Sequence, residues 1–244
     1  MFQFKQFSIS DSDCGMKIGV DGVLLGAWIQ DESPANILDV GTGSGLIALM
    51  MAQKFPKAII HAVEIESDAI KQASKNFINS PFDNQFITHE IDFLRVDKLL
   101  SNDKNTAVKF DIIVANLPYF DDGGSFIDSK RDLARSSKHL PLETFFIRSI
   151  ALLENQGSMY FIYPNNETDH IKELADQVGF QIDTIVQIQG NPDTTVKRCL
   201  YKASKWEPST NYRAPENQLL VIEIERGKYT KEYKELCKDF YLKF

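Results

Sequence analysis

Cysteine and histidine are scarce in this chain of 244 residues, which has three of the first and four of the second. Cys14, Cys199 and Cys237 are far apart and form no C-x-x-C pair, and the histidines lack the spacing of metal ligands. These shortages argue against a disulfide framework and against a structural metal site. We therefore predict a protein of the reducing cytoplasm that holds no metal.

Long hydrophobic runs are absent as well. No apolar run approaches the roughly 18 residues that a membrane span requires, and the first residues lack the basic and apolar regions of a secretory signal. We also find no internal repeat, no low-complexity tract and no linker-like stretch. The length suits one α/β core with small additions. We predict a single domain over 1–244 without a membrane partner, in which 1–30 caps the ligand pocket and 205–244 is an extension.

Positive charge is in deficit, since the net charge is −7. The deficit is uneven: residues 193–244 contain eleven Lys and Arg against eight Asp and Glu, a net charge of +3, which leaves −10 for residues 1–192. A second basic cluster lies in the middle of the chain, at Lys130, Arg131, Arg135 and Lys138. Such local patches can bind phosphates in spite of an acidic total, although a basic cluster is also typical of an ordinary solvated surface.

What the chain does have is a glycine-rich turn, I-L-D-V-G-T-G-S-G at 37–45. A short apolar strand contains Asp39, and a helix is predicted from Leu46 to about Gln53. The glycines between them suit a sharp turn whose backbone touches a ligand, next to a helix N-terminus with unpaired N–H groups. The dinucleotide fingerprint G-x-G-x-x-G is not met, because Leu46 occupies the place of its third glycine.

Acids follow the predicted strands on this side of the sheet. Asp39 suits a ligand with an ammonium group, and Glu64, directly after the strand 58–63, is at the distance from the glycines at which an acid binds ribose hydroxyls. Glycine turn and acids together resemble the S-adenosylmethionine site of Rossmann-like class I methyltransferases. The resemblance implies an S-adenosylmethionine cofactor held by Asp39, Gly41, Gly43, Gly45, Glu64 and Asp92. Asp92 lies just past the strand 85–90, where it is either an exposed loop acid or, as similarity to the methyltransferase pattern implies, the adenine contact.

The remaining pattern alternates strands and helices, which favours an α/β fold with a mostly parallel sheet. With the resemblance it predicts a Rossmann-like, seven-stranded sheet with helices on both faces. Besides those above, we predict strands at 110–115, 157–163, 180–189, 196–203 (returning antiparallel) and 219–225, and helices at 67–79, 142–153, 167–178 and 230–241.

The N-terminal stretch 16–28, M-K-I-G-V-D-G-V-L-L-G-A-W, reads as a turn at Gly19–Gly22 followed by an apolar helix capped by Asp21. Either it is only a capped and packed helix, or the turn closes the methionine end of the cofactor pocket, with Lys17 and Asp21 as the cofactor-binding candidates. Before it, phenylalanines alternate with polar residues at 2–7, which predicts an edge strand or a clasp across the domain.

A second motif, Asn116-Leu117-Pro118-Tyr119, ends the apolar strand 110–115. Methylation of an exocyclic amine is difficult because the nitrogen lone pair is delocalised into the ring. The side-chain oxygen of Asn116 and the carbonyl of Leu117 can each accept one N–H of such an amine, Pro118 fixes their direction, and the Tyr119 ring can stack on a flipped base. Alignment and electrostatic preorganisation then carry the rate.

This motif resembles the Asn/Asp-Pro-Pro-aromatic motif of amino methyltransferases, with Leu117 in place of the first proline. The sequence Asn-Leu-Pro-Tyr is itself similar to the motif of ribosomal RNA adenine dimethyltransferases. Protein glutamine methyltransferases use the same pair of hydrogen-bond acceptors. The stretches 4–7, 16–28, 38–46 and 240–242 instead resemble the bacterial valine-tRNA (adenine-N6) methyltransferase family over nearly the whole chain. That resemblance implies a tRNA partner and methylation of the adenine beside the anticodon, position 37. The alternatives are ribosomal RNA methylation, protein glutamine methylation and a non-catalytic S-adenosylmethionine-binding module.

Overall fold

The protein is known from a computed structural model that describes residues 1–98, 108–117, 140–206 and 213–244. Within these residues eight strands form one sheet in the order β10-β8-β9-β7-β6-β3-β4-β5. These strands are β3 (Asn36–Val40), β4 (Ile59–Glu64), β5 (Phe86–Glu90), β6 (Phe110–Asn116), β7 (Leu153–Pro164), β8 (Phe180–Gln189), β9 (Arg198–Lys205) and β10 (Glu216–Val221).

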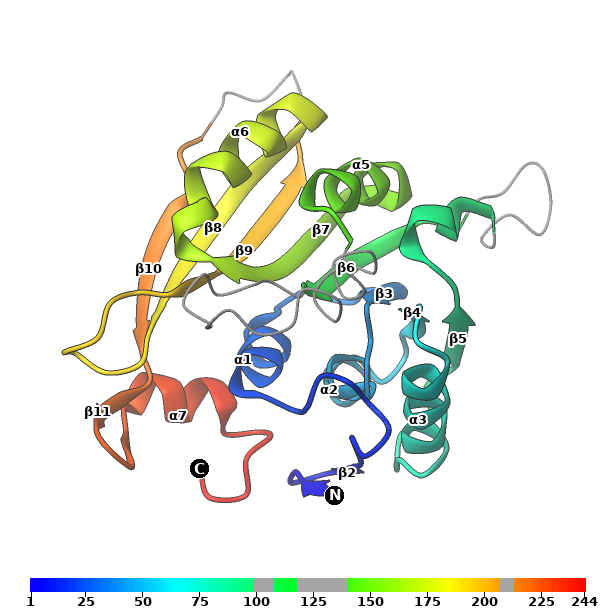
Figure 1. Ribbon diagram of the computed structural model, residues 1–244, viewed down its shortest axis with the longest axis horizontal. Helices are drawn as coiled ribbons and strands as arrows, with labels where there is room; N and C mark the ends of the chain where they lie inside the picture. The colour runs from blue at the N-terminus through cyan, green and yellow to red at the C-terminus, as the bar shows by residue number, and fades with distance from the viewer. Residues whose placement is uncertain (99–107, 118–139, 207–212) are drawn as a thin grey trace, which may run out of the picture.

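Helices cover both faces of this sheet (Figure 1). Below it in that view lie α1, α2, α3 and α7, and above it lie α5 and α6. Their bounds are α1 (Val20–Trp28), α2 (Leu46–Lys54), α3 (Ser67–Ile78), α5 (Leu142–Leu152), α6 (Thr168–Val178) and α7 (Lys231–Cys237), with a 3-10 turn η1 (Phe93–Lys98) after β5. The strands in the middle are apolar along most of their length because both faces are covered.

Strand directions agree with a mostly parallel sheet. Each neighbouring pair from β5 to β7 is parallel, and β9 runs antiparallel to both β7 and β8. The prediction of seven strands was wrong for the described sheet, which has eight. Each of the eight strands has a predicted counterpart, but the last, β10, begins at residue 216 and not at 219, where it pairs in parallel with β8. Its first half is polar and exposed, so only the apolar end of the segment gave a strand signal. β10 also brings part of the predicted 205–244 extension into the main sheet.

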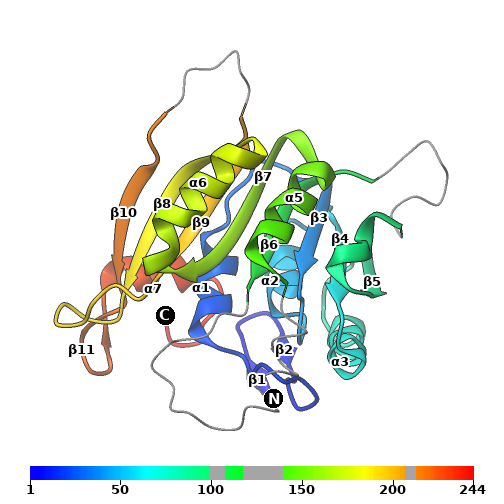
Figure 2. The same cartoon turned by 45° about the horizontal axis from the view of Figure 1, so that its top comes forward.

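The chain changes direction across the sheet beside β3. From β3 it proceeds outward to β4 and β5, and it then crosses back to β6 on the other side of β3. Ligands of open α/β sheets bind at such a switch point, outside the carboxyl ends of the strands. β3 and β6 are parallel neighbours, so the glycine turn that follows β3 lies at the same rim of the sheet as Asn116, the last residue of β6 (Figure 2).

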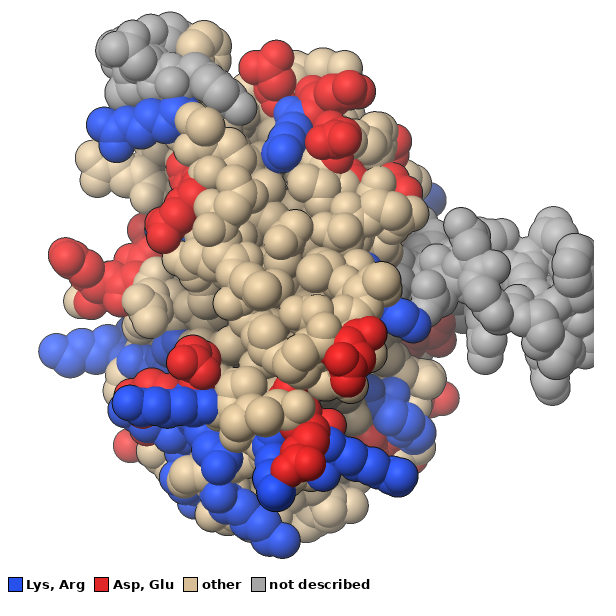
Figure 3. Space-filling view, turned by 90° about the vertical axis from the view of Figure 1, so that its left-hand side faces the viewer, with Lys and Arg blue, Asp and Glu red and all other residues tan. Residues whose placement is uncertain are grey.

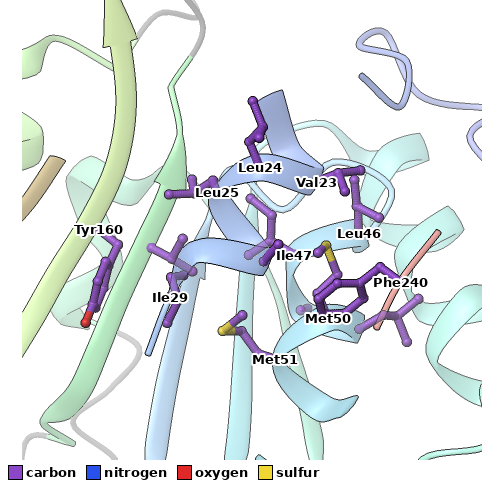
Figure 4. Close-up of a cluster of buried hydrophobic side chains, with 14 of the residues drawn as sticks. Val23, Leu24, Leu25, Ile29, Leu46, Ile47, Met50, Met51, Tyr160 and Phe240 are labelled. Atoms are coloured by element: carbon purple, nitrogen blue, oxygen red, sulfur yellow. The ribbon is translucent and has the colours of Figure 1, made fainter. Parts of the chain in front are cut away.

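Close packing of α1 on α2 fills the core below the rim (Figure 4). Apolar side chains of both helices interdigitate there, with Tyr160 of β7 at one end and Phe240 near the C-terminus at the other. A Cβ atom at Gly26 would stand 2.6 Å from the Sδ atom of Met50. Gly26 therefore lets α1 and α2 approach each other closely, and this contact fixes the position of α1 relative to α2.

The two ends of the chain lie together. A short hairpin, β1 (Phe2–Gln3) with β2 (Ser8–Ile9), precedes α1, and a second, β11 (Glu223–Glu225) with β12 (Lys228–Tyr229), precedes α7. The backbone N–H of Lys5 donates to the carbonyl of Phe240, and the Lys5 ammonium donates to the carbonyl of Phe244 at 2.8 Å. The N-terminal phenylalanines thus form a clasp that packs on the C-terminal segment. No helix in the described ranges combines the length and the apolar character needed to cross a membrane.

Candidate functional site

The glycine turn after β3 has two glycines that face open space and one that faces the protein. Gly41 and Gly43 have φ angles of 68° and 55°, in the left-handed region, and a Cβ atom on either would meet no heavy atom within 4 Å. Gly45 is also left-handed, with a φ of 87°, but a Cβ there would stand 2.5 Å from the ring of Phe77. Gly41 and Gly43 thus leave room for a ligand at the turn, while Gly45 allows α3 to pack under it.

Asp39 is buried beneath this turn, with 1% of its surface exposed. One carboxylate oxygen, Oδ2, accepts hydrogen bonds from the hydroxyl of Thr42 at 2.6 Å and from the backbone N–H of Ala48 at 3.1 Å. The other oxygen, Oδ1, is buried and has no hydrogen-bond partner among the described residues. Burial raises the pKa of Asp39 to about 7, against the lowering effect of its two hydrogen bonds. A buried carboxylate with one unsatisfied oxygen fits a cationic group on a ligand.

Glu64 stands at the end of the neighbouring strand, β4. Its Oε2 accepts the backbone N–H of Gly43 at 3.0 Å, and its Oε1 accepts the N–H groups of Ile65 and Glu66 at 2.8 and 3.0 Å. Glu64 is therefore joined to the glycine turn through the backbone of Gly43, and its binding of ribose hydroxyls stays a prediction. Asp92 lies two residues beyond β5. Its Oδ1 accepts the backbone N–H of Leu94 at 2.9 Å, so the carboxylate caps the first turn of η1.

The N-terminal segment is fastened beside the turn by Asn76 of α3. The buried Asn76 amide donates to the carbonyls of Ser10 and Ser44, each at 2.8 Å, and its oxygen accepts the N–H of Ser10 at 3.1 Å. Lys17 in this segment donates to the carbonyl of Asp11 at 2.6 Å. The segment that we predict to cap the pocket thus contacts the glycine turn through one side chain.

We predicted from the sequence that Asp21 caps α1, and this prediction was wrong. The N-cap position is Gly19, no side chain bonds the cap, and Asp21 lies inside the first turn. Its carboxylate forms an ion pair with Arg198 at the start of β9. The backbone of Val20 is already helical, because the turn at Gly19 ends earlier than the residue pattern indicated. A cofactor-binding role for Asp21 and Lys17 stays a prediction.

Asn116 and Leu117 end β6 at the rim. The side chain of Asn116 is half-buried and makes no hydrogen bond to another described residue, whereas Leu117 is buried with 3% exposed. A Cβ atom at Gly22 of α1 would stand 3.8 Å from the Nδ2 atom of Asn116, so the first turn of α1 packs against this amide. The remaining candidates, Pro118 and Tyr119 and the basic Lys130, Arg131, Arg135 and Lys138, lie outside the described residues.

Reasoning from the sequence missed three residues of this site. Thr42 was noted only as part of the glycine turn, Asn76 lies in the middle of an amphipathic helix, and Arg198 belongs to a strand more than 150 residues from its partner Asp21. A hydroxyl three residues after a buried acid was the one local signal available. The other two depend on tertiary contacts, for which the sequence pattern carries no sign.

Comparison with known proteins gives consistent results. The methyltransferase small domain family matches residues 7–179. The chain is 38% identical to the tRNA1(Val) (adenine(37)-N6)-methyltransferase of Parabacteroides distasonis, over 99% of this chain and 98% of that protein. It is 37% identical to the protein of the same name from Flavobacterium psychrophilum, over the full length of both.

Solved structures resemble the fold. A predicted O-methyltransferase from Agrobacterium tumefaciens superposes with a TM-score of 0.66 at 17% identity, covering 90% of this chain and 96% of that one. A ribosomal protein L11 methylase from Lactobacillus delbrueckii subsp. bulgaricus gives 0.54 at 18% identity, over 76% and 77% of the two chains. At these identities the likeness concerns the fold alone, which is that of Rossmann-like methyltransferases.

Proposed function

The chain belongs to the family of tRNA1(Val) (adenine(37)-N6)-methyltransferases, and from this membership we propose that it transfers a methyl group from S-adenosylmethionine to N6 of adenine 37 in a valine tRNA. The single observation that carries the proposal is full-length identity of 35–38% to eight proteins of that name. The place of Asn116 at the end of β6 supports it. The cytoplasm, where tRNA is modified, remains the proposed compartment.

The residues at the glycine turn fit the proposed cofactor. S-adenosylmethionine supplies, when bound, a methyl group on a positively charged sulfur. Asp39 offers a buried carboxylate with one unsatisfied oxygen to the ammonium group, and Glu64 offers a strand-end carboxylate to the ribose hydroxyls. Gly41 and Gly43 keep the space over the turn free, because a side chain at either would require a strained left-handed backbone. Asp92 is proposed as the adenine contact.

Asn116 and Leu117 act on the target amine. The side-chain oxygen of Asn116 and the carbonyl of Leu117 accept the two N–H groups, which draws the lone pair of the nitrogen out of the ring. One N–C bond forms as the S–C bond breaks, and the amine then releases a proton to solvent. The two acceptors lower the barrier by holding the nitrogen in line, so no general base is needed before transfer. Pro118 and Tyr119 are proposed to fix this backbone and to stack on the flipped base.

A basic surface near the C-terminus supports contact with tRNA phosphates. Figure 3 shows Lys and Arg gathered on the lower part of one face, on the side where Figure 1 has α7 and β11. The exposed basic residues of this segment are Arg226, Lys228, Lys231, Lys234, Lys238 and Lys243. Together with Lys130, Arg131, Arg135 and Lys138 they are the proposed phosphate contacts, in a protein whose total charge is −7.

Methyl transfer from labelled S-adenosylmethionine to unmodified total tRNA, ribosomal RNA and a release-factor-like protein tests the proposal. N6-methyladenosine in tRNA is the expected product, and label in ribosomal RNA or protein would contradict the tRNA assignment. We expect Asn116→Ala to lower kcat by about 100-fold or more, the scale of losing one preorganised hydrogen-bond partner, with cofactor affinity nearly unchanged. Isothermal titration with S-adenosylmethionine measures that affinity, and a large loss would refute the role given to Asn116.

A further inference from the structure

The first turn of α1 touches two strands on either side of β7. Asp21 forms its ion pair with Arg198, the first residue of β9, and the next residue, Gly22, packs against Asn116, the last residue of β6. In the sheet the order is β9-β7-β6, so consecutive residues of one helical turn reach strands that are not neighbours. All these residues lie at the same rim, because β9 starts where the parallel strands end.

The ion pair is sheltered from solvent. About a fifth of each side chain is exposed, and the two contacting atoms, Oδ1 of Asp21 and Nε of Arg198, are themselves buried. A guanidinium remains charged at every relevant pH and holds a carboxylate in a fixed orientation. Loss of Asp21 leaves the sheltered guanidinium of Arg198 without this carboxylate, and loss of Arg198 removes the cation from beside the Asp21 carboxylate, so either change favours a displacement of the turn.

Gly22 transmits such a displacement to the amine-accepting residue. A Cβ atom on Gly22 would stand 3.1 Å from Cδ2 of Leu46, a tight contact, and 3.8 Å from Nδ2 of Asn116, an ordinary van der Waals contact, so the turn is a near neighbour of both side chains. One turn further along the same face of α1, Gly26 packs closely on Met50 of α2. These contacts fix the position of the first turn of α1 on the side of α2, and the ion pair fixes it on the side of β9.

We propose that Asp21 and Arg198 are positioning residues for the adenine half of the site: their ion pair seats the first turn of α1 against Asn116 and so aims the Asn116 amide at the target nitrogen. The inference rests on the proposed function, since it assigns the pair to amine alignment. It gives Asp21 a role other than the predicted cofactor contact, and it separates α1 from the glycine turn in function.

The test compares Asp21→Ala, Arg198→Ala, the double variant and Arg198→Lys with the wild-type protein. Single-turnover and steady-state methyl transfer to unmodified tRNA give kcat and the KM for tRNA, and calorimetry gives the Kd of S-adenosylmethionine. We expect both single variants and the double variant to lose kcat to the same extent, about tenfold or more, with cofactor Kd within twofold. Arg198→Lys, which keeps the charge, should recover part of kcat. Lys172→Ala, which removes an exposed ion pair on α6, is the matched control and should change nothing.

Several results would overturn the proposal. An unchanged kcat excludes positioning, and losses that multiply in the double variant show that the two residues act separately. A rise in the KM for tRNA alone identifies Arg198 as a direct phosphate contact, and a weaker cofactor Kd returns Asp21 to the cofactor pocket. If the wild-type protein itself methylates no tRNA, the proposed function has failed and not this inference.

Gly22→Ala decides the matter if the charge variants fold poorly, which their melting temperatures reveal. Alanine favours the helix more than glycine, which offsets the crowding of Leu46, so this variant should remain folded while its methyl group comes into contact with the amide of Asn116. A loss of kcat without a loss of cofactor affinity supports the proposed positioning of Asn116 by the first turn of α1, and a wild-type kcat overturns it.

Discussion

The proton on Asp39 should control cofactor affinity near neutral pH. Burial raises the pKa of this carboxyl to about 7 when the site holds no ligand. A cationic ammonium group beside the carboxylate favours its ionised form, so binding should lower the pKa and release a proton. If the bound-state pKa falls below about 5.5, the Kd of S-adenosylmethionine should be about six- to eightfold tighter at pH 7.5 than at pH 6.0.

Calorimetry at the two pH values measures this ratio, and repeating it in buffers of different ionisation enthalpy counts the released protons. The ligand's own amino group titrates near pH 8, so the wild-type ratio is compared with that of Asp39→Asn, in which only the ligand titrates. Asp183→Asn is the matched control, because Asp183 is another largely buried acid with a raised pKa, on β8 and bonded to Ser204. An equal pH ratio in wild type and Asp39→Asn, or the loss of the effect in Asp183→Asn, would refute the reasoning.

The same proton affects stability with a definite sign. The folded-state pKa of Asp39 lies above its ordinary value, so between about pH 4 and 7 the folded protein holds this proton more tightly than the unfolded chain. The contribution of Asp39 to the free energy of unfolding therefore falls as pH rises through this window. Urea titrations should show Asp39→Asn gaining stability relative to wild type from pH 5 to pH 8.

Three substitutions test the packing around the site. Asn76→Ala should weaken S-adenosylmethionine binding several-fold while kcat at saturating cofactor is kept, because it frees the N-terminal segment from the glycine turn; equal losses in both parameters would count against this. Gly45→Ala should lower the free energy of unfolding by about 2 kcal/mol or more in urea titrations, since it combines left-handed strain with a contact to Phe77. Gly26→Ala should cost about 1–3 kcal/mol by the same assay, and shortening Met50 to alanine in that background should relieve part of its overpacking.

The sequence predicted the part of the site that is built from local signals. A strand that ends near an acid, glycines in a turn and a helix start after them are all properties of neighbouring residues, and β3, the turn and α2 are confirmed within a residue or two. The return of β9 was also confirmed, because the turn at 190–193 lies between two apolar runs. β10 was predicted three residues too late, at 219–225 and not 216–221, since its polar first half is held by pairing with β8 and has no apolar alternation of its own.

The contacts that join distant segments could not be predicted in this way. Nothing in the residues around Asn76 distinguishes it from a surface asparagine, and only the fold brings Ser10 and Ser44 to either side of its amide. Asp21 illustrates the same limit from the other direction: an acid near a helix start favours a capping role by residue type, but Arg198 competes for it across the sheet. An ion pair with a guanidinium is stronger than a cap bond here because both charged groups are sheltered from solvent.

The rim has two walls, one formed by β3 and β4 and the other by β6, and different side chains support each. On the β3 and β4 side, Asp39, Glu64 and the glycine turn are tied to one another and, through Asn76, to the N-terminal segment. On the β6 side, Asn116 is supported by α1, which is held by β9. The two walls are neighbours, since β3 pairs with β6 and α1 packs on α2 at Gly22 and Gly26, but the side chains that support each wall differ. Changes on one wall should therefore alter cofactor affinity and changes on the other should alter kcat, because a methyl donor and an amine that are positioned by separate supports can be disturbed separately.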